Sequence, residues 1–380
     1  MLDWGVKMDY SWNRDCKEFL GNYACEVLKT EGYKDCSECK FYDPKGKKIL
    51  IIKLGAKGDV IRTLSILPEI KKKYPDSHVT WLIDSGSVEI LEGNPNIDKI
   101  LSYNFESYLR LKQEKFDVLF CLEITSPATL LSNEINADEK YGYYFDKDGH
   151  PSPFNESAHY YLERVFSDHT NKTNRKTYQE MMFDICNLSY EKHKPKIYLS
   201  EKENKYAEEF KKQNKINEYD KLIGIHIGTA GRWVSKAWHV DETIKLISKL
   251  LINYKVLLFA GPDDIKQQEF IRRHFVADKL LTNNPNNSLK EFFSLVNICE
   301  VMLTNDSLAL HAATALNKKT ISLFFCTPPW EVESYGLVAK IVSPLLEKYF
   351  YSDLYHEDLV KSITAEEVYN ELTALISLSN

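Results

Sequence analysis

Three short segments of the sequence place polar residues where apolar runs end. The first, Gly55-Ala56-Lys57-Gly58-Asp59, follows the run ILIIKL and precedes a helical pattern. Its two glycines permit a tight turn that leaves room for a ligand. Asp59 stands at or beside the start of the helix, where an aspartate is a good cap and where its carboxylate could also act as a general base. No Gly-Lys-Ser/Thr follows, which argues against a nucleoside triphosphatase.

The second segment is Gly228-Thr229-Ala230-Gly231, which directly follows an apolar run and is followed by Lys236. Small residues after a strand expose backbone N–H groups that can hold a phosphate oxygen. A nearby lysine could neutralise the charge of a leaving diphosphate. Taken alone, the segment is a weak signal, and an ordinary loop is the favoured interpretation.

The third segment, Asn305-Asp306-Ser307-Leu308, ends a strand and opens a helix. The N-terminus of such a helix favours an anion. His311 lies four residues after Ser307 and therefore on the same helical face. A helix cap combined with a buried core histidine is the alternative interpretation.

Four of the eight cysteines fall in the first 40 residues: Cys16, Cys25, Cys36 and Cys39. The last two form a Cys-x-x-Cys knuckle, and the first two could complete a four-thiolate site. A segment this short, with few aliphatic residues, can hardly build its own core. In a reducing compartment a metal is favoured over disulfides. We therefore expect a structural zinc, with iron second, while unliganded thiols and a redox pair are the alternatives.

Alternating strand and helix patterns must position these segments. Apolar runs predict strands over 48–54, 78–83, 99–103, 116–122, 222–227, 255–260, 279–281, 301–304 and 320–325. Helices are predicted between them, which indicates βαβ units and parallel sheets. The expected fold class is α/β, with two Rossmann-like, doubly wound domains. Ligands bind at the carboxyl ends of the strands in such sheets, so two facing sheets would enclose a central cleft.

The same patterns divide the chain into five parts. We expect a cysteine-rich module over 1–45, a first Rossmann-like domain over 46–205, a linker over 206–220, a second Rossmann-like domain over 221–345 and a helical segment over 346–380 that could cross back. Within the first domain, residues 124–200 look irregular and rich in aromatic residues, apart from a predicted helix over 178–188.

Composition excludes several classes of protein. The 380 residues are 43% hydrophobic, with 49 basic and 55 acidic side chains and a net charge of −6. This balance gives no global attraction to nucleic acid. No apolar run approaches the length of about 18 residues that a membrane span needs, and the first residues lack the pattern of a signal peptide. We therefore expect a cytoplasmic protein.

Taken in order, the three segments resemble glycosyltransferase family 9, the bacterial ADP-heptose heptosyltransferases of GT-B fold. The resemblance rests on ILIIKLGAKGDVIRTLSILPEIKKKYPDSHVTWLID, IGIHIGTAGRWVSKAW, VLLFAGPDD and VMLTNDSLALHAATALNKKTISLFF, and covers residues 49–336. Proteins of this group with a cysteine-bearing leader before the first strand are also similar, which supports the cysteine cluster as a module.

The resemblance implies a role for each candidate residue. Asp59 matches the proposed catalytic base, Thr229 and Lys236 match residues at the donor diphosphate, and Asp306, Ser307 and His311 match a D-S/T-G-x-x-H segment that contacts donor sugar and phosphate. Asp263 and Asp264 stand where acidic residues lie near the ribose, and Leu308 replaces a usual glycine. The expected donor-binding set is Gly55, Gly58, Gly228, Thr229, Ala230, Lys236, Asp263, Asp264, Asp306, Ser307, Leu308 and His311.

The implied reaction is transfer of a heptose, or a related sugar, from an ADP-activated donor to a hydroxyl group with inversion. The first domain would bind the acceptor (a glycan, a lipid core or a protein) through the region 124–200, and the second would bind the donor. Lysine and helix dipole would replace any catalytic metal or cofactor. Peripheral contact with the inner membrane face and oligomerisation through the cysteine module are further expectations.

Two other classes of function remain open on the sequence. One is a non-catalytic nucleotide-sugar binding or scaffold protein, which Leu308 in place of glycine would favour. The other is a sugar-nucleotide epimerase of similar architecture, which would convert the donor with no acceptor present.

Overall fold

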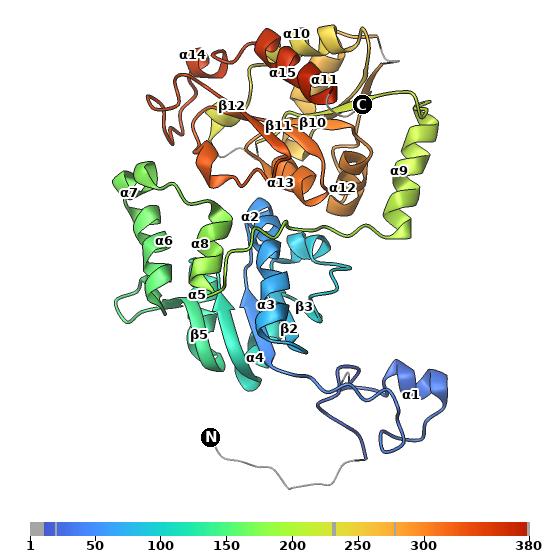
Figure 1. Ribbon diagram of the computed structural model, residues 1–380, viewed down its shortest axis with the longest axis vertical. Coiled ribbons are helices and arrows are strands. Elements are labelled where there is room, and N and C mark those ends of the chain that lie inside the picture. Colours follow the sequence, from blue (N-terminus) through green and yellow to red (C-terminus); the bar gives the residue numbers. More distant parts are fainter. Residues whose placement is uncertain (1–10, 20, 230–232, 277–278, 378–380) are drawn as a thin grey trace.

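The chain forms two α/β domains and a small N-terminal module, stacked along the long axis of the molecule (Figure 1). The computed structural model describes residues 11–19, 21–229, 233–276 and 279–377. Each domain contains a six-stranded sheet. The prediction of an α/β fold with two doubly wound domains is therefore confirmed.

The first domain has the strand order β3-β2-β1-β4-β5-β6. Its elements are β1 (Lys48–Ile52), α2 (Lys57–Thr63), η1 (Leu64–Ile66), α3 (Leu67–Lys73), β2 (His78–Ile83), η2 (Ser85–Ile90), β3 (Lys99–Ser102), α4 (Phe105–Gln113), β4 (Lys115–Cys121), α5 (Ser126–Glu134), β5 (Asn136–Phe145), β6 (Pro151–Pro153), α6 (Glu156–Phe166), α7 (Asp168–Thr173) and α8 (Tyr178–Ile185). β1 pairs in parallel with β2 and β4. The strand order reverses between β1 and β4, so the topological switch point of this sheet lies there.

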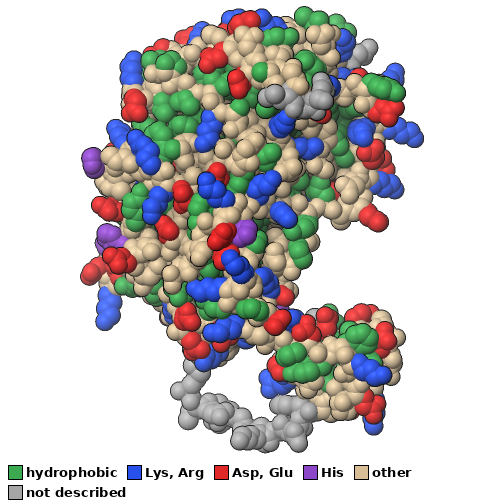
Figure 2. Space-filling view, in the orientation of Figure 1, with side chains coloured by type: hydrophobic (Ala, Val, Ile, Leu, Met, Phe, Trp, Pro, Cys, Tyr) green, Lys and Arg blue, Asp and Glu red, His purple; other side chains and the backbone are tan. Residues whose placement is uncertain are grey.

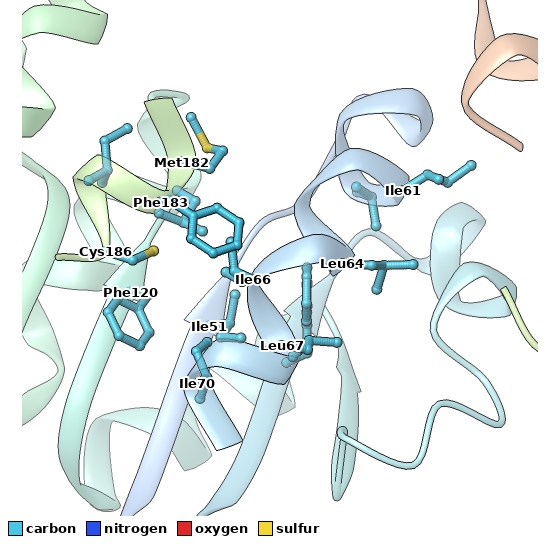
Figure 3. Packing of buried hydrophobic residues seen from close by; sticks show 14 of the residues in the cluster. Ile51, Ile61, Leu64, Ile66, Leu67, Ile70, Phe120, Met182, Phe183 and Cys186 are labelled. Carbon is cyan, nitrogen blue, oxygen red and sulfur yellow. The ribbon is translucent and has the colours of Figure 1, made fainter. Parts of the chain in front are cut away.

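β1 is a continuous apolar run because helices cover both faces of the sheet. On one face Ile51 packs with Ile66 and Ile70 from the first helices and with Phe183 from α8 (Figure 3). On the other face Leu50 and Ile52 pack against α4 and α5. This two-sided burial fixes the carboxyl end of β1 as a rigid platform.

Residues 124–200 are more regular than the sequence suggested, which corrects that expectation. α5, β5, α6 and α7 precede the one predicted helix, α8. β5 reads NADEKYGYYF, and its charged residues and glycine are depleted in strands. The strand conformation of β5 therefore depends on its pairing with the buried strand β4 and not on its local sequence.

The second domain has the strand order β12-β11-β10-β7-β8-β9, with parallel pairs throughout the described ladder. Its elements are α9 (Glu201–Gln213), β7 (Leu222–His226), η3 (Val234–Lys236), α10 (Val240–Leu250), β8 (Lys255–Phe259), η4 (Pro262–Asp264), α11 (Ile265–Arg272), β9 (Leu280–Thr282), α12 (Leu289–Asn297), β10 (Val301–Asn305), α13 (Leu308–Ala315), β11 (Lys319–Phe324), η5 (Pro329–Glu331), β12 (Val338–Val342), α14 (Glu357–Val360) and α15 (Ala365–Ser377). The switch point lies between β7 and β10. The edge strand β12 was not predicted.

The chain crosses between the domains earlier than expected. Tyr206 and Phe210 of α9 pack into the second core, so the predicted linker 206–220 lies within the second domain. The crossing is made by the extended segment 189–200. At the other end, α15 packs on α10 (Figure 1) and buries Leu372 in the second core. The C-terminal segment therefore stays with the second domain and does not cross back.

The two domains meet where helices α12 and α13 rest on the first domain. α13 packs against α2, and Phe293 and Ala312 join the main hydrophobic cluster of the first domain. This contact brings the carboxyl ends of β1 and β10 together. The switch points of both sheets therefore face the same interdomain region.

The N-terminal module, with α1 (Glu26–Glu31), lies at the end of the first domain that is remote from the second (Figure 1). Its attachment runs through Gly46, whose N–H donates to the Asp76 carbonyl at 3.0 Å. In Figure 2 the module appears as a separate lobe with mixed charged and apolar surface. In the part of the chain that is described, no helix combines the length and the apolar character needed to cross a bilayer.

Candidate functional site

The switch point of the first sheet holds a buried ion pair. Lys53 follows β1 and Glu123 follows β4, and Lys53 Nζ lies 3.1 Å from Glu123 Oε2. Both side chains are almost fully buried, and Lys53 is 4% exposed. A buried charge is tolerated only when it is paired. The pair therefore links the carboxyl ends of β1 and β4, directly before the predicted turn Gly55-Ala56-Lys57-Gly58-Asp59.

Asp59 lies in the first turn of α2, beside this pair. Ala56 occupies the N-cap position, and no side chain caps the helix, so the interpretation of Asp59 as a cap is wrong. Its carboxylate instead pairs with the Arg62 guanidinium, and its Oδ2 lies 4.0 Å from Lys53 Nζ. Burial opposes ionisation of this carboxyl, but Arg62 and Lys53 outweigh it and lower the pKa of Asp59. The side chain keeps 29% exposure, which leaves it accessible to a ligand.

Across the domain boundary, Asp306 forms a second charged cluster at the end of β10. Its Oδ2 lies 3.0 Å from Lys236 Nζ and accepts a hydrogen bond from Thr327 Oγ1 at 2.9 Å. Burial alone would raise the pKa of Asp306, and the charge of Lys236 holds that pKa well below its usual value. Lys236, from η3, thus lies where its charge faces the start of α13.

His311 links the two clusters. Its Nε2 lies 3.9 Å from Asp306 Oδ1, and its ring packs against Gly58 of α2. A Cβ at Gly58 would lie 2.7 Å from His311 Cδ2. Burial lowers the pKa of His311 to about 3, so the ring is neutral at neutral pH. Gly58 therefore serves a close approach between domains rather than the tight turn that we expected.

Ser307 is the N-cap of α13. Its Oγ accepts from the Ala309 N–H at 3.3 Å and lies 2.9 Å from Thr304 Oγ1. His226 Nδ1, at the end of β7, lies 3.4 Å from the same hydroxyl. Leu308 packs against the main core cluster of the first domain, so its side chain fills the domain interface.

The loop after β7 approaches the loop after β8. A Cβ at Gly228 would lie 2.3 Å from Asp264 Oδ2, so only glycine permits this contact. Burial raises the pKa of Asp264, and Asp263 adds to the effect. Thr229, the next residue, is half-buried. Ala230, which we also expected to bind the donor, lies outside the described residues.

A cavity of about 870 Å³ opens between the domains beside Asp59. Gly55 and Asp59 line it from the first domain, together with Arg164 of α6, and Trp233 and Tyr351 line it from the second. The donor-binding residues predicted on the second domain are not among its described lining residues. The structure thus brings Asp59 near the Asp306 cluster. Asp263 and Asp264 lie in η4, which follows β8 of the second sheet.

Several residues of this site were not predicted: Lys53, Arg62, Glu123 and His226. Three of them share a signal that sequence analysis could have used. Lys53, Glu123 and His226 each terminate an apolar run that forms a buried parallel strand. A polar side chain at the carboxyl end of such a strand points to the ligand-binding edge. Arg62 gave no such signal, because it lies within a helical pattern.

The four N-terminal cysteines line one cavity of about 370 Å³ in the module, and Cys16 is buried. The chemistry of these four thiols suits a four-thiolate metal site. Among the residues that the structure describes, no three His, Cys, Asp or Glu side chains are placed to share a metal ion. The expected metal site is therefore not confirmed.

The arrangement as a whole suits group transfer rather than redox chemistry. It offers an ionised carboxylate, Asp59, that can accept a proton at the cavity wall. It also offers a lysine and a helix N-terminus, at Lys236 and Ser307, that can stabilise an anionic leaving group. These two functions lie on opposite domains and meet where α2 packs on α13.

Known proteins match both the sequence and the fold. The family model described as glycosyltransferase family 9 (heptosyltransferase) matches residues 108–355. Lipopolysaccharide heptosyltransferase 1 of Campylobacter coli is 24% identical over 316 residues, which are 78% of this chain and 89% of that protein.

Two solved structures show the same architecture. A glycosyl transferase family 9 protein from Veillonella parvula DSM 2008 has a TM-score of 0.72 at 21% identity, covering 88% of this chain and 98% of its own. The ADP-heptose LPS heptosyltransferase II of E. coli has a TM-score of 0.65 at 19% identity, covering 87% of this chain and 99% of its own. The expected arrangement of two facing Rossmann-like domains, the GT-B fold, is thereby confirmed.

Proposed function

Because the chain belongs to glycosyltransferase family 9, the heptosyltransferases, and is a glycosyltransferase, we propose that it transfers a heptose from ADP-heptose to an acceptor hydroxyl with inversion. The observation that carries the proposal is the meeting of Asp59 with the Lys236–Asp306–His311 cluster across the domain boundary. Chemistry of this kind needs a base and an anion-stabilising site in one cleft.

Asp59 takes the role of the base. It accepts the proton of the acceptor hydroxyl while the oxygen of that hydroxyl bonds to the anomeric carbon. The bond between that carbon and the diphosphate breaks on the opposite face, which inverts the configuration. The lowered pKa of Asp59 keeps the carboxylate ionised and ready to accept a proton at neutral pH.

The second domain takes the donor. Lys236 and the N–H groups at the start of α13 stabilise the departing diphosphate. Gly228, Thr229 and Ala230 supply backbone donors after β7, and Asp263 and Asp264 contact the ribose. Asp306 and His311 orient the sugar and phosphate, and no residue in this scheme requires a catalytic metal.

The acceptor enters from the first domain. Tyr161 and Arg164 line the interdomain cavity beside Asp59, in the region where acceptor contacts were expected. The relatives are lipopolysaccharide heptosyltransferases, so a lipid-linked core sugar is the acceptor to test first and a protein hydroxyl is the second. Action in the cytoplasm at the inner membrane face is part of this proposal.

The alternatives fit less well. The scaffold interpretation depended on Leu308 crowding the donor site, whereas the Leu308 side chain packs in the domain interface. An epimerase would need no acceptor, and the matched family and its relatives are transferases.

The decisive test is Asp59→Asn in a transfer assay with ADP-heptose and a heptose-free lipopolysaccharide core. Loss of a positioned base costs about 10²- to 10⁴-fold in rate, while ADP affinity measured by calorimetry should stay near wild type. Asp138→Asn serves as the matched control, because Asp138 pairs with Lys115 in an exposed position near the amino ends of β4 and β5. Transfer by Asp59→Asn at close to the wild-type rate would refute the assignment.

We also propose that Cys16, Cys25, Cys36 and Cys39 bind a structural metal, zinc ahead of iron, and that the module so formed can mediate oligomerisation. Support comes from the convergence of all four on one cavity and from the small size of the module. Metal analysis of the purified chain should give about one ion per chain, which Cys36→Ser/Cys39→Ser should remove. A wild-type chain without stoichiometric metal would exclude the site.

A further inference from the structure

Lys53 is an almost fully buried cation between two carboxylates, at the wall of the interdomain cavity. Its Nζ lies 3.1 Å from Glu123 Oε2 and 4.0 Å from Asp59 Oδ2. The side chain of Lys53 is 5% exposed, so water does not screen these interactions as it does at a surface. A lysine in this setting acts on the acidic residues beside it more strongly than on any distant ligand.

We propose that Lys53 is a positioning residue: held in place by Glu123, it fixes the orientation of the Asp59 carboxylate and preserves its negative charge. The inference rests on the proposed function of Asp59 as the base and adds residues that neither the sequence motifs nor the family resemblance identified.

The anchor of this arrangement is Glu123. Its Oε1 accepts from the Ile124 N–H at 3.2 Å, and its Oε2 also accepts from the Gly55 N–H at 3.4 Å. Glu123 is therefore tied to the segment that follows β4 and to the turn that leads into α2. On the other side, the Lys53 carbonyl accepts from Trp81 Nε1 at 3.2 Å. Both ends of the ion pair are thus held by the central strands of the sheet.

Other groups also face Asp59. Arg62, one turn along α2, pairs with its Oδ1 and stacks on the Tyr178 ring of α8 at 4.0 Å. Tyr161 of α6 lies close enough to Asp59 and Lys53 to interact with both charges.

The second domain contributes His311, whose charge would act on Asp59, and Asp306, which acts on Arg62. Lys53 directly follows β1 and ties Asp59 to the sheet, whereas Arg62 shares α2 with Asp59 and His311 belongs to the second domain. When the domains shift, Lys53 and Arg62 both stay with Asp59, and Lys53 is the one that fixes the carboxylate relative to the sheet.

Two substitutions should move the titration of Asp59 in opposite directions. Lys53→Met removes a positive neighbour and should raise the midpoint by about one to two pH units, the range typical of a carboxylate beside one opposite charge. Glu123→Gln removes a competing negative charge and frees Lys53 for Asp59, so the midpoint should fall. Lys53→Arg keeps the charge and should stay near wild type.

The midpoint can be read without turnover by carbon-13 NMR of the full chain labelled at aspartate carboxyls. The Asp59 signal is assigned by its absence from Asp59→Asn. In the transfer assay, Lys53→Met should then lose rate on the acid side at a higher pH than wild type, while ADP affinity is unchanged.

Because Lys53→Met leaves Glu123 buried without a cationic partner, the double variant Lys53→Met/Glu123→Met provides a second route. It removes both charges, and since Lys53 is the one that contacts Asp59, the midpoint should still rise. An unchanged midpoint in either variant, or shifts of the same sign in Lys53→Met and Glu123→Gln, would overturn the inference. Failure of the proposed function is seen separately, as transfer activity retained by Asp59→Asn.

Discussion

At the residue scale, Gly58 lies next to the proposed base Asp59 and also in the contact between the two domains. It is the second residue of α2, where glycine is less favourable than alanine by at most about 1 kcal/mol. The structure gives a reason for it, since the His311 ring occupies the space that a Cβ would need. The same ring reaches toward Asp306, so one small residue lets the base-bearing helix and the donor cluster approach each other.

Gly58→Ala should therefore destabilise the protein although it improves helix propensity. Displacing packed atoms costs about 1–3 kcal/mol, which exceeds the gain of about 1 kcal/mol in the helix. Chemical denaturation should show a net loss in the free energy of unfolding. Gly55→Ala is the matched control, because a Cβ there meets no atom within 4 Å. A more stable Gly58→Ala would mean that the His311 ring yields without cost.

At the scale of elements, the sequence predicted the strands whose position is determined by a local run of apolar residues. The buried strands β1, β2, β4, β7, β8 and β10 are apolar runs, and their predicted positions agree with the structure to within a few residues. A capping box is present at the start of α12, where Ser288 and Glu291 have the Ser-x-x-Glu spacing typical of one.

What could not be predicted depends on contacts between distant segments. β5 owes its conformation to pairing with β4, and the assignment of α9 to the second domain depends on where Tyr206 and Phe210 pack. The same limit applies to the candidate site. Asp59 and Asp306 stand in recognisable motifs, whereas the contact of Arg62 with Asp59 depends on side-chain geometry.

Substitutions at two helix caps can distinguish an effect on stability from an effect on ligand binding. Ser288 caps α12 and Ser307 caps α13 with similar hydrogen bonds to backbone N–H groups, each 3.3 Å long. Replacing either by alanine should cost about 1 kcal/mol of stability. Only Ser307→Ala should also weaken ADP binding, by about 3- to 10-fold in calorimetry, since the start of α13 is the proposed diphosphate site. Equal ADP affinity in the two variants would place the diphosphate elsewhere.

At the scale of the whole molecule, polar contacts join the two domains in addition to the packing of α13 on α2. On one side the Lys290 N–H of α12 donates to Glu89 Oε2 at 2.8 Å. On the other, Arg164 of α6 pairs with Glu331 of η5 at 2.7 Å. Arg164 also lines the interdomain cavity. Opening the cleft on the α6 side must therefore break a buried ion pair.

The pair is reinforced by its surroundings. Arg164 also donates to Asn171 Oδ1 at 3.1 Å, and Asn174 Nδ2 donates to Glu331 Oε1 at 3.3 Å. Beside it, the Arg175 guanidinium stacks on the Trp330 ring at 4.4 Å. Burial raises the pKa of Glu331, which Arg164 partly offsets. Helices α6 and α7, on the left of the first domain in Figure 1, thus form a strap across the domain boundary.

Glu331→Gln should loosen this strap. It leaves the Arg164 guanidinium buried without a carboxylate, and breaking a buried pair in this way costs about 3–5 kcal/mol. Because the strap spans two domains, part of that cost can be relieved by separating them, so small-angle scattering of the ligand-free protein should give a larger radius of gyration. Arg164→Met/Glu331→Met, which removes both charges, should recover most of the stability. Glu208→Gln, in an exposed pair with Lys211, should change neither quantity, since surface pairs contribute at most about 1 kcal/mol. If Glu331→Gln lowers stability but leaves the radius of gyration at the wild-type value, the pair stabilises the fold without holding the cleft closed.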